Sequence, residues 1–311
     1  MSMQVVQTWE QNLSQKKLAI GLGNFDGLHI GHMSLLSQLL EESEQKNLTT
    51  MLYTFSEHTQ TVLNRGQKPP QILTLEKKIQ LLSRTKLDYL YLEDFTPEYA
   101  TLTPEEFVKN ILVDRFSVAL VVIGFNYSFG HKGAGKASDM QRFGEKYGFE
   151  VVVMPPIQLD EMAVSSTLIR QYIQAGDVER VRLCTGRYYS IYGTVEMGRQ
   201  IGTTIGFPTA NIIPEEYLAL PRAGVYVTCT ILDGEVYNSI TNVGHNPTFG
   251  ALQQTSCETH IFGREGNLYG KRIEVFFMTK LRDERKFENK EALCRQINQD
   301  IRTAREFFNA L

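Results

Sequence analysis

Short apolar runs alternate with amphipathic stretches along the first half of the chain. The apolar runs lack polar alternation, which is typical of strands buried on both faces of a sheet; they occupy residues 16–23, 49–55, 87–95, 118–124 and 150–156. The stretches between and after them repeat their apolar residues at helical spacing and predict helices over 31–47, 74–86, 103–116, 138–148 and 165–176. This alternation predicts a parallel sheet with helices on both faces.

The predicted helix over 103–116 has a complete start signal. Thr103 offers a capping hydroxyl, Pro104 suits the first helical position, and Glu106 completes a capping box. The three residues together favour a helix that starts at this point of the chain.

The pattern changes after Gly176. From Tyr188 to Lys280 the chain is rich in Tyr, Val, Ile and Thr and alternates in the manner of strands. Asp233 and Gly234 separate two alternating runs, which predicts a hairpin over 225–240. Residues 258–278 have the pattern of a second hairpin. We expect this region to form a small antiparallel barrel.

The last residues, 286–311, predict an amphipathic helix. We expect its apolar face to pack on the barrel; that face holds Leu293, Ile297, Ile301 and Phe308. No long linker separates the two patterns. We place the boundary near residue 184, which gives one domain over 1–183 and another over 184–311.

Composition and charge narrow the class of protein. A chain of 311 residues is long enough for two domains that each bury a core. Its 42% hydrophobic and 22% charged residues are those of an ordinary globular protein. The net charge of −3, from 32 basic and 35 acidic residues, provides no overall basic field for nucleic acid or an anionic membrane.

The cysteines and the N-terminal residues indicate the cellular compartment in which the protein is expected. No apolar signal segment opens the sequence, and its apolar runs are too short to span a bilayer. The cysteines are isolated, with no CxxC pair, so neither a zinc ribbon nor a disulfide framework is expected; they are Cys184, Cys229, Cys257 and Cys294. We therefore expect a soluble protein of the reducing cytoplasm.

His29 and His32 lie in a glycine-rich segment between the first buried strand and its helix. A helix N-terminus at the carboxyl edge of a parallel sheet favours an anion such as phosphate, and glycines permit its close approach. A dinucleotide fingerprint fails because Asp26 occupies the position of the third glycine. A zinc site lacks a third ligand nearby. Spacing alone leaves two structural loop histidines as the alternative.

The string "GNFDGLHIGH", at 23–32, resembles the GxFDGxHxGH signature of the nucleotidyltransferase superfamily. More closely, it resembles the N-terminal module of the bacterial bifunctional riboflavin kinase/FAD synthetase family. The resemblance implies a Rossmann-like parallel sheet that adenylylates FMN, with His29 and His32 as catalytic residues. It also implies contacts with ATP and its phosphates from Gly23, Phe25, Asp26 and Gly31.

A second string, "VSSTLIR" at 164–170, resembles the ISSTxIR motif of these adenylyltransferases. Hydroxyls and N–H groups at a helix start, with an arginine one turn on, suit a phosphate, although an ordinary serine-capped helix has the same pattern. The candidates are Ser165, Ser166, Thr167 and Arg170. Residues 123–136 resemble the family's glycine- and aromatic-rich loop, which places Asn126 near the bound nucleotide or flavin.

That loop contains a string with P-loop spacing, "GHKGAGK". Ala137 stands where Ser or Thr should hold Mg²⁺, and "FNYSF" separates the glycines from the preceding strand. A P-loop is therefore not expected.

The string "YGTVEMGRQIGTTIGFPTANI", at 192–212, resembles the riboflavin kinase signature and matches its core "GFPTAN" fully. Thr209 and Asn211 offer neutral oxygens that suit Mg²⁺ held together with ATP phosphates. Thr203 stands where the family often has arginine, a departure that concerns one basic contact and not the reaction class. The resemblance implies ATP or flavin contacts from Gly198, Gly206, Phe207 and Pro208.

Residues 241–250 and 256–262 resemble the family's next two segments, and the resemblance assigns the catalytic base to Glu258. A base is needed because the primary hydroxyl of riboflavin is a weak nucleophile until its proton is accepted. Taken alone, a strand glutamate most often faces solvent. Residues 281–293 also resemble the family, which makes Arg282 a candidate for contacting the ligand.

We therefore expect a two-step enzyme that phosphorylates riboflavin to FMN and adenylylates FMN to FAD, with Mg²⁺ and with ATP as co-substrate. Its expected partners are riboflavin, FMN and ATP, without nucleic acid or membrane, and the chain is expected to be a monomer or to self-associate weakly. The alternatives are an N-terminal domain that acts only on reduced flavin, acts on another phosphorylated substrate, or has lost activity. A flavin-binding regulator without turnover is a further alternative.

Overall fold

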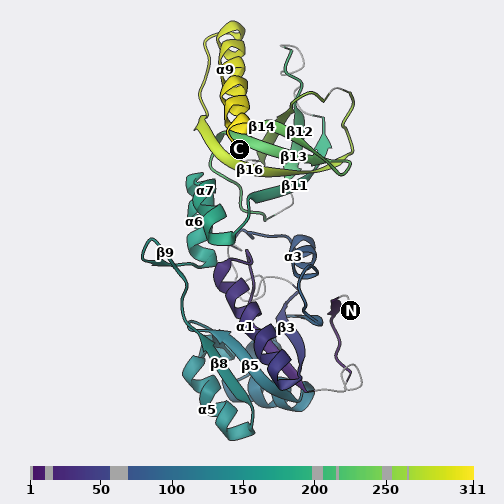
Figure 1. Ribbon diagram of the computed structural model, residues 1–311, viewed down its shortest axis with the longest axis vertical. Coiled ribbons are helices and arrows are strands. Elements are labelled where there is room, and N and C mark those ends of the chain that lie inside the picture. Colours follow the sequence, from purple (N-terminus) through teal and green to yellow (C-terminus); the bar gives the residue numbers. More distant parts are fainter. Residues whose placement is uncertain are drawn as a thin grey trace. The chain divides into compact units, whose positions relative to one another are not determined.

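The computed structural model describes residues 3–10, 17–56, 69–197, 206–214, 217–246, 254–264 and 266–311. The chain divides into two compact units, Met1–Ser166 and Thr167–Leu311. Figure 1 follows the elements of each unit along the sequence.

The first unit contains a six-stranded sheet in which every neighbouring pair of strands is parallel, as the alternating pattern predicts. The strand order is β1-β4-β3-β2-β5-β8. The strands are β1 (Gln4–Val6), β2 (Leu18–Leu22), β3 (Thr49–Phe55), β4 (Tyr89–Glu93), β5 (Val118–Gly124) and β8 (Glu150–Met154). The edge strand β1 was not predicted, because three residues are too few for a periodic signal.

Helices cover both faces of this sheet. Leu18 and Ile20 of β2 pack in the core beside η3 and α5, whereas Ala19 packs in the core beside α1 and α3. This alternation confirms that the central strands are buried on both sides. The helices are α1 (Ile30–Lys46), α3 (Leu75–Leu82), α4 (Pro104–Glu106), η3 (Phe107–Arg115) and α5 (Ala137–Tyr147), with the single turns η2 (Tyr99–Thr101) and η4 (His131–Gly133).

The helix predicted over 103–116 starts where its capping signal places it. The Thr103 hydroxyl accepts from the N–H of Glu106, whose carboxylate accepts from the N–H of Thr103. After one α-helical turn the winding widens to the π form from Phe107 to Arg115. Two short antiparallel pairs complete this unit: β6 (Ser128–Phe129) with β7 (Gly135–Lys136), and β9 (Gln158–Leu159) with β10 (Met162–Ala163).

The second unit contains a closed antiparallel barrel with the strand order β11-β12-β15-β14-β13-β16, which confirms the predicted barrel. Its inner surface includes linked hydroxyls, since Thr228 contacts Ser239 at 2.8 Å and Thr241 at 2.9 Å. The strands are β11 (Tyr189–Glu196), β12 (Ala210–Pro214), β13 (Gly224–Leu232), β14 (Glu235–Asn246), β15 (Gln254–Ile261) and β16 (Arg272–Asp283).

One of the two predicted hairpins is present and the other is not. Asp233 and Gly234, with φ of 54° and 84°, connect β13 to β14 in a two-residue turn. The prediction of a second hairpin over 258–278 was wrong: β15 pairs with β12 and β14, whereas β16 pairs with β11 and β13. Alternation along a strand predicts the strand but not its partner, and no tight turn joins these two strands.

The second unit also contains the helices α6 (Ser166–Ala175), α7 (Val178–Thr185) and the terminal helix α9 (Lys290–Asn309). The boundary between the two units lies just after Ser166, the first residue of α6. Ile301 and Phe308 of the predicted apolar face pack, together with Ala304, against Val227 and Ile240 of the barrel. The other two residues of that face, Leu293 and Ile297, are half-buried and lie outside this cluster. Among the helices that the structure describes, none combines the length and the apolar character that crossing a bilayer requires.

Candidate active sites

The loop after β2 holds an unusual concentration of left-handed backbone. Phe25, Gly27 and Leu28 have φ of 48°, 85° and 39°. A left-handed conformation costs a residue other than glycine roughly 1–2 kcal/mol. The loop therefore needs contacts that hold it in this form, and it leads directly into the predicted histidine pair.

His29 and His32 lie face to face at the start of α1. Their ring centroids are 3.6 Å apart and the rings are 19° from parallel. His29 caps the helix, because its Nδ1 accepts from the backbone N–H of His32 at 3.3 Å. A neutral His29 ring that accepts at Nδ1 carries its proton on Nε2, which makes Nε2–H a donor for a ligand.

Two predicted residues let the rings adopt this arrangement. A side-chain carbon on Gly31 would lie 3.1 Å from Nδ1 of His29, so glycine keeps the space beside that ring open. Phe25 is fully buried, and its ring meets the His32 ring edge-on at 5.2 Å. A side-chain carbon on Gly23 would in turn lie 3.2 Å from the Phe25 ring. Gly31 and Phe25 therefore shape the histidine pair directly, and Gly23 leaves room for the Phe25 ring.

The N-terminus of α1 favours a negatively charged ligand. The helix is 17 residues long and its first turn contains no acidic residue. Its dipole and free N–H groups favour an anion close to the two histidines. The geometry suits a phosphate chain, as the sequence predicts.

The serine motif reaches the same loop. The Ser166 hydroxyl donates to the backbone carbonyl of Asp26 at 2.8 Å, and the Asp26 carboxylate accepts from the N–H of Ile72 at 3.0 Å. Ser165 is half-buried just before it. Thr167 and Arg170 lie further along α6, within the second compact unit, and their contact with a triphosphate stays a prediction.

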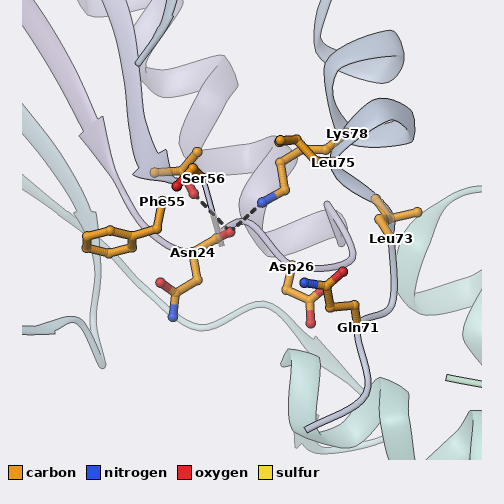
Figure 2. A pocket seen from close by; sticks show the side chains of 9 residues that line it. Asn24, Asp26, Phe55, Ser56, Gln71, Leu73, Leu75 and Lys78 are labelled. Carbon is orange, nitrogen blue, oxygen red and sulfur yellow. Dashed lines mark hydrogen bonds between the residues drawn. The ribbon is translucent and has the colours of Figure 1, made fainter. Parts of the chain in front are cut away.

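Beside the histidine loop lies a pocket that the sequence did not predict (Figure 2). Lys78 of α3 points into it and donates to the carbonyl of Asn24 at 3.0 Å. Burial lowers the pKa of Lys78 to about 8, although the negative charge of Asp26 opposes this shift. Residues lining the pocket include Asn24, Asp26, Thr54, Phe55, Gln71 and Lys78.

A signal for Lys78 is present in the sequence. Leu75, Ile79 and Leu82 repeat at the spacing of one apolar helix face, and position 78 lies on that same face. Burying a charged side chain on an apolar helix face costs free energy, so a lysine at such a position indicates a specific partner or a function.

Asn126 lies exposed just after β5, where the resemblance places it, and its contact with a nucleotide stays a prediction. The P-loop-like string beyond it folds differently from a P-loop. It forms the turn η4 and the strand β7, which pairs with β6 just before the string, and Lys136 donates to the carbonyl of Gly133 at 2.7 Å. The lysine is thus turned back onto its own loop.

In the barrel, the predicted metal ligands and the predicted base come together. Asn211 and Glu258 are direct partners on β12 and β15. Ala210 and Ile212 are buried inside the barrel, so the intervening Asn211 faces outward. Glu258 likewise lies between the buried Cys257 and Thr259. Thr209 lies directly before β12 and is half-buried.

A second carboxylate flanks the same asparagine. Glu196 of β11 is the partner of Asn211 on its other side. It is exposed, whereas Glu258 is half-buried. The backbone geometry alone therefore offers two candidate bases, and only the resemblance favours Glu258.

The "GFPTAN" segment is fixed to β15 by one side chain. Nδ1 of His260 donates to the carbonyl of Pro208 at 2.8 Å, and the Phe207 ring lies edge-on to the His260 ring at 6.1 Å. Gly206 has φ of 85°, which favours glycine. Gly198 and Thr203 lie outside the described residues.

The donor set around Asn211 fits a hard divalent cation. Its Oδ1 is buried and has no hydrogen-bond partner among the residues that the structure describes. A buried amide oxygen in this state is suited to a metal ion that prefers oxygen ligands. Within the described ranges no cluster of three His, Cys, Asp or Glu side chains forms an alternative metal site.

Arg282 is engaged within the protein. Its Nη2 donates to Asp300 of α9 at 2.8 Å and its Nε at 3.1 Å, and Asp300 is buried. This pair holds the terminal helix to the end of β16. A ligand contact by Arg282 stays a prediction.

Comparisons with known proteins identify the family of the chain. Residues 11–168 match a family model described as FAD synthetase, and residues 185–308 match one described as riboflavin kinase. Two relatives share the name bifunctional riboflavin kinase/FMN adenylyltransferase. The relative from Listeria monocytogenes is 36% identical over 294 residues, covering 94% of this chain and 93% of its own length. The relative from Bacillus subtilis is 34% identical over 301 residues, covering 96% and 94%.

One solved structure matches nearly the whole chain. It is described as a macrolide-efflux protein from Streptococcus pneumoniae, has a TM-score of 0.88 at 28% identity, and is matched over 98% of this chain and 99% of its own. The two family matches and the length of the curated alignments decide the assignment. The chain belongs to the family of bifunctional riboflavin kinases/FMN adenylyltransferases, enzymes of flavin cofactor synthesis.

Proposed function

We propose that the two reactions are divided between the two halves of the chain, with the functional boundary near residue 184. Riboflavin is phosphorylated on the barrel, and FMN is adenylylated at the parallel sheet. The ranges of the two family matches, ending at 168 and beginning at 185, support this boundary.

The pairing of Asn211 with Glu258 carries the kinase half of the proposal. Glu258 accepts the proton of the riboflavin 5′-hydroxyl as that oxygen attacks the γ-phosphorus of ATP, and the products are FMN and ADP. Thr209 and Asn211 would hold Mg²⁺, which when bound neutralises charge on the ATP phosphates. The nearby segment 206–208 is proposed to contact ATP or flavin.

The stacked histidines carry the adenylyltransferase half. A phosphate oxygen of FMN attacks the α-phosphorus of a second ATP, and the bond to pyrophosphate breaks, which gives FAD. No general base is required, because the FMN phosphate is already anionic. Nε2–H of His29 and the His32 ring then stabilise negative charge on the departing pyrophosphate.

The remaining predicted residues hold the triphosphate in place. Ser165, Ser166, Thr167 and Arg170 are proposed to contact its far end, supported by the hydrogen bond that ties Ser166 to the histidine loop. Asn126 is proposed to contact the nucleotide or the flavin.

The substrates are the small molecules riboflavin, FMN and ATP, and we place the enzyme in the cytoplasm, where ATP is supplied. We propose a monomer or weak self-association. The efflux role in the name of the matched solved structure is not carried over to this chain, because each half of the chain matches a flavin-enzyme family.

Time-resolved chromatography of flavins tests both halves. The purified chain is incubated with riboflavin, ATP and Mg²⁺, and we expect FMN to appear first and FAD later. FMN without FAD, both with oxidised and with dithionite-reduced flavin, would contradict the adenylyltransferase half and favour another phosphorylated substrate. If FAD formed only from reduced flavin, the N-terminal site would be redox-selective. Bound flavin without ATP consumption would identify a regulator.

A further inference from the structure

Lys78 is a buried cation whose hydrogen-bond acceptor belongs to the histidine loop. The side chain is only 9% exposed, and its ammonium donates to the carbonyl of Asn24 at 3.0 Å (Figure 2). Asn24 is the second residue of the "GNFDGLHIGH" string. The contact therefore joins α3 to the loop that places His29 and His32.

A hydrogen bond to this carbonyl does not by itself require a charge. The neutral hydroxyl of Thr54, at the end of β3, donates to the same oxygen at 3.1 Å. Burying an ammonium costs free energy that a neutral donor would not, and lysine is rarely found this buried. The other donor to the carbonyl of Asn24 is nevertheless the charged side chain of Lys78, close to Asp26.

The histidine loop needs such contacts to keep its conformation. Its left-handed residues Phe25 and Leu28 are strained, and a strained loop relaxes unless its surroundings fix it. Contacts from different elements fix it: Lys78 and Thr54 donate to the carbonyl of Asn24, and Ile72 and Ser166 donate to the carboxylate and the carbonyl of Asp26. The Lys78 ammonium contributes twice, since it also attracts the Asp26 carboxylate.

We infer that Lys78 is a positioning residue for adenylyl transfer: its ammonium fixes Asn24 and Asp26, and through them the loop that sets the His29–His32 stack. This inference rests on the proposed role of the two histidines. Lys78 itself does not touch the reacting atoms. It acts through the backbone of the loop.

The test compares three forms of the full chain: wild type, Lys78→Met and Thr54→Val. Methionine keeps an unbranched chain but removes the charge and the donor. Valine at position 54 removes only the Thr54 hydroxyl that donates to the carbonyl of Asn24 and keeps the shape of the side chain. For each form we would measure kcat and KM for FMN and ATP, the riboflavin kinase rate of the same preparation, and the NMR resonances of the His29 and His32 rings without ligand.

We expect Lys78→Met to lower kcat for FAD formation by roughly 10- to 100-fold, because small misplacements of catalytic groups have effects of this size. The KM values should change less than kcat, and the kinase rate should stay the same. The His29 and His32 resonances should shift in the free enzyme, since ring stacking affects them directly. Thr54→Val should shift the same resonances and lower kcat by a smaller factor.

Two results would overturn the inference. Unchanged kcat with unmoved histidine resonances would reduce Lys78 to a packing residue. A raised KM for FMN or ATP with unmoved resonances would make it a substrate contact. If Lys78→Met also lost kinase activity through unfolding, Thr54→Val would decide by the same two readouts. Failure of the wild type to form FAD would contradict the proposed function, and the resonances would still show whether Lys78 positions the pair.

Discussion

His29 lies with its ring stacked on that of His32, and Nδ1 of His29 accepts the hydrogen bond that caps the helix carrying both. The first histidine is thus oriented by the backbone of the second. This arrangement leaves a donor on Nε2 of His29 at the positive end of α1, where a departing pyrophosphate would be stabilised.

His32→Ala should lower the rate of FAD formation by on the order of 10²–10³, the usual cost of removing one donor to a developing charge. Riboflavin phosphorylation by the same chain should stay nearly unchanged, because the residues proposed for it lie on the barrel. Both rates are measured by chromatography with riboflavin or FMN supplied. A parallel fall of both activities in a folded variant would contradict the division of labour.

Gly31→Ala should separate activity from stability. Gly31 is the second residue of α1, where alanine is favoured over glycine by about 1 kcal/mol; this gain offsets the loss of about 1 kcal/mol from the His29 cap, so thermal stability should stay close to that of the wild type. The new carbon would lie 3.1 Å from Nδ1 of His29 and displace that ring. We expect FAD formation to fall at least tenfold while the kinase rate is kept. Wild-type FAD formation in this variant would mean that the ring position is not critical.

Glu258→Gln and Glu196→Gln decide which neighbour of Asn211 is the base. Glutamine keeps the size of either side chain and removes the proton acceptor. We expect Glu258→Gln to lower riboflavin phosphorylation by on the order of 10²–10⁴, and Glu196→Gln to have little effect. FAD formation from added FMN serves as the control in both variants. The opposite ranking would transfer the role of base to Glu196.

The buried Lys78 should make stability depend on alkaline pH. Its pKa of about 8 lies below the value of about 10.4 in an unfolded chain. Between these values the unfolded state binds more protons, so the free energy of unfolding of the wild type rises with pH relative to Lys78→Met. From pH 8 to pH 10 this difference should grow by on the order of 2 kcal/mol, and below about pH 7 it should be constant.

Denaturant unfolding followed by the fluorescence of Trp9 measures this difference, since Trp9 packs edge-on against Tyr89 of the parallel sheet at 5.2 Å. Burial also raises the pKa of Tyr53 and Tyr99, which lowers stability at high pH. Both tyrosines are present in each variant, so their effect cancels in the comparison. A pH-independent difference would show that Lys78 is not desolvated in the folded protein.

Local features of the fold could be predicted from the sequence because each is determined by a few neighbouring residues. The capping box of Thr103 and Glu106 and the turn at Asp233 and Gly234 each depend only on residues within four positions of one another. The buried strands follow from their apolar runs. The histidine string and the "GFPTAN" string were enough to indicate the family, because each consists of residues that are adjacent in the chain.

Pairings between distant segments were decided by the tertiary structure. The sequence marks β15 and β16 as strands, but the closed barrel places β16 beside β11 and β13. The register that sets Asn211 opposite both Glu258 and Glu196 is equally non-local. The sequence marks Lys78 as a charge on an apolar helix face, but only the fold provides its partner, the carbonyl of Asn24 at 3.0 Å. Such contacts depend on packing between elements, which no local pattern of residues specifies.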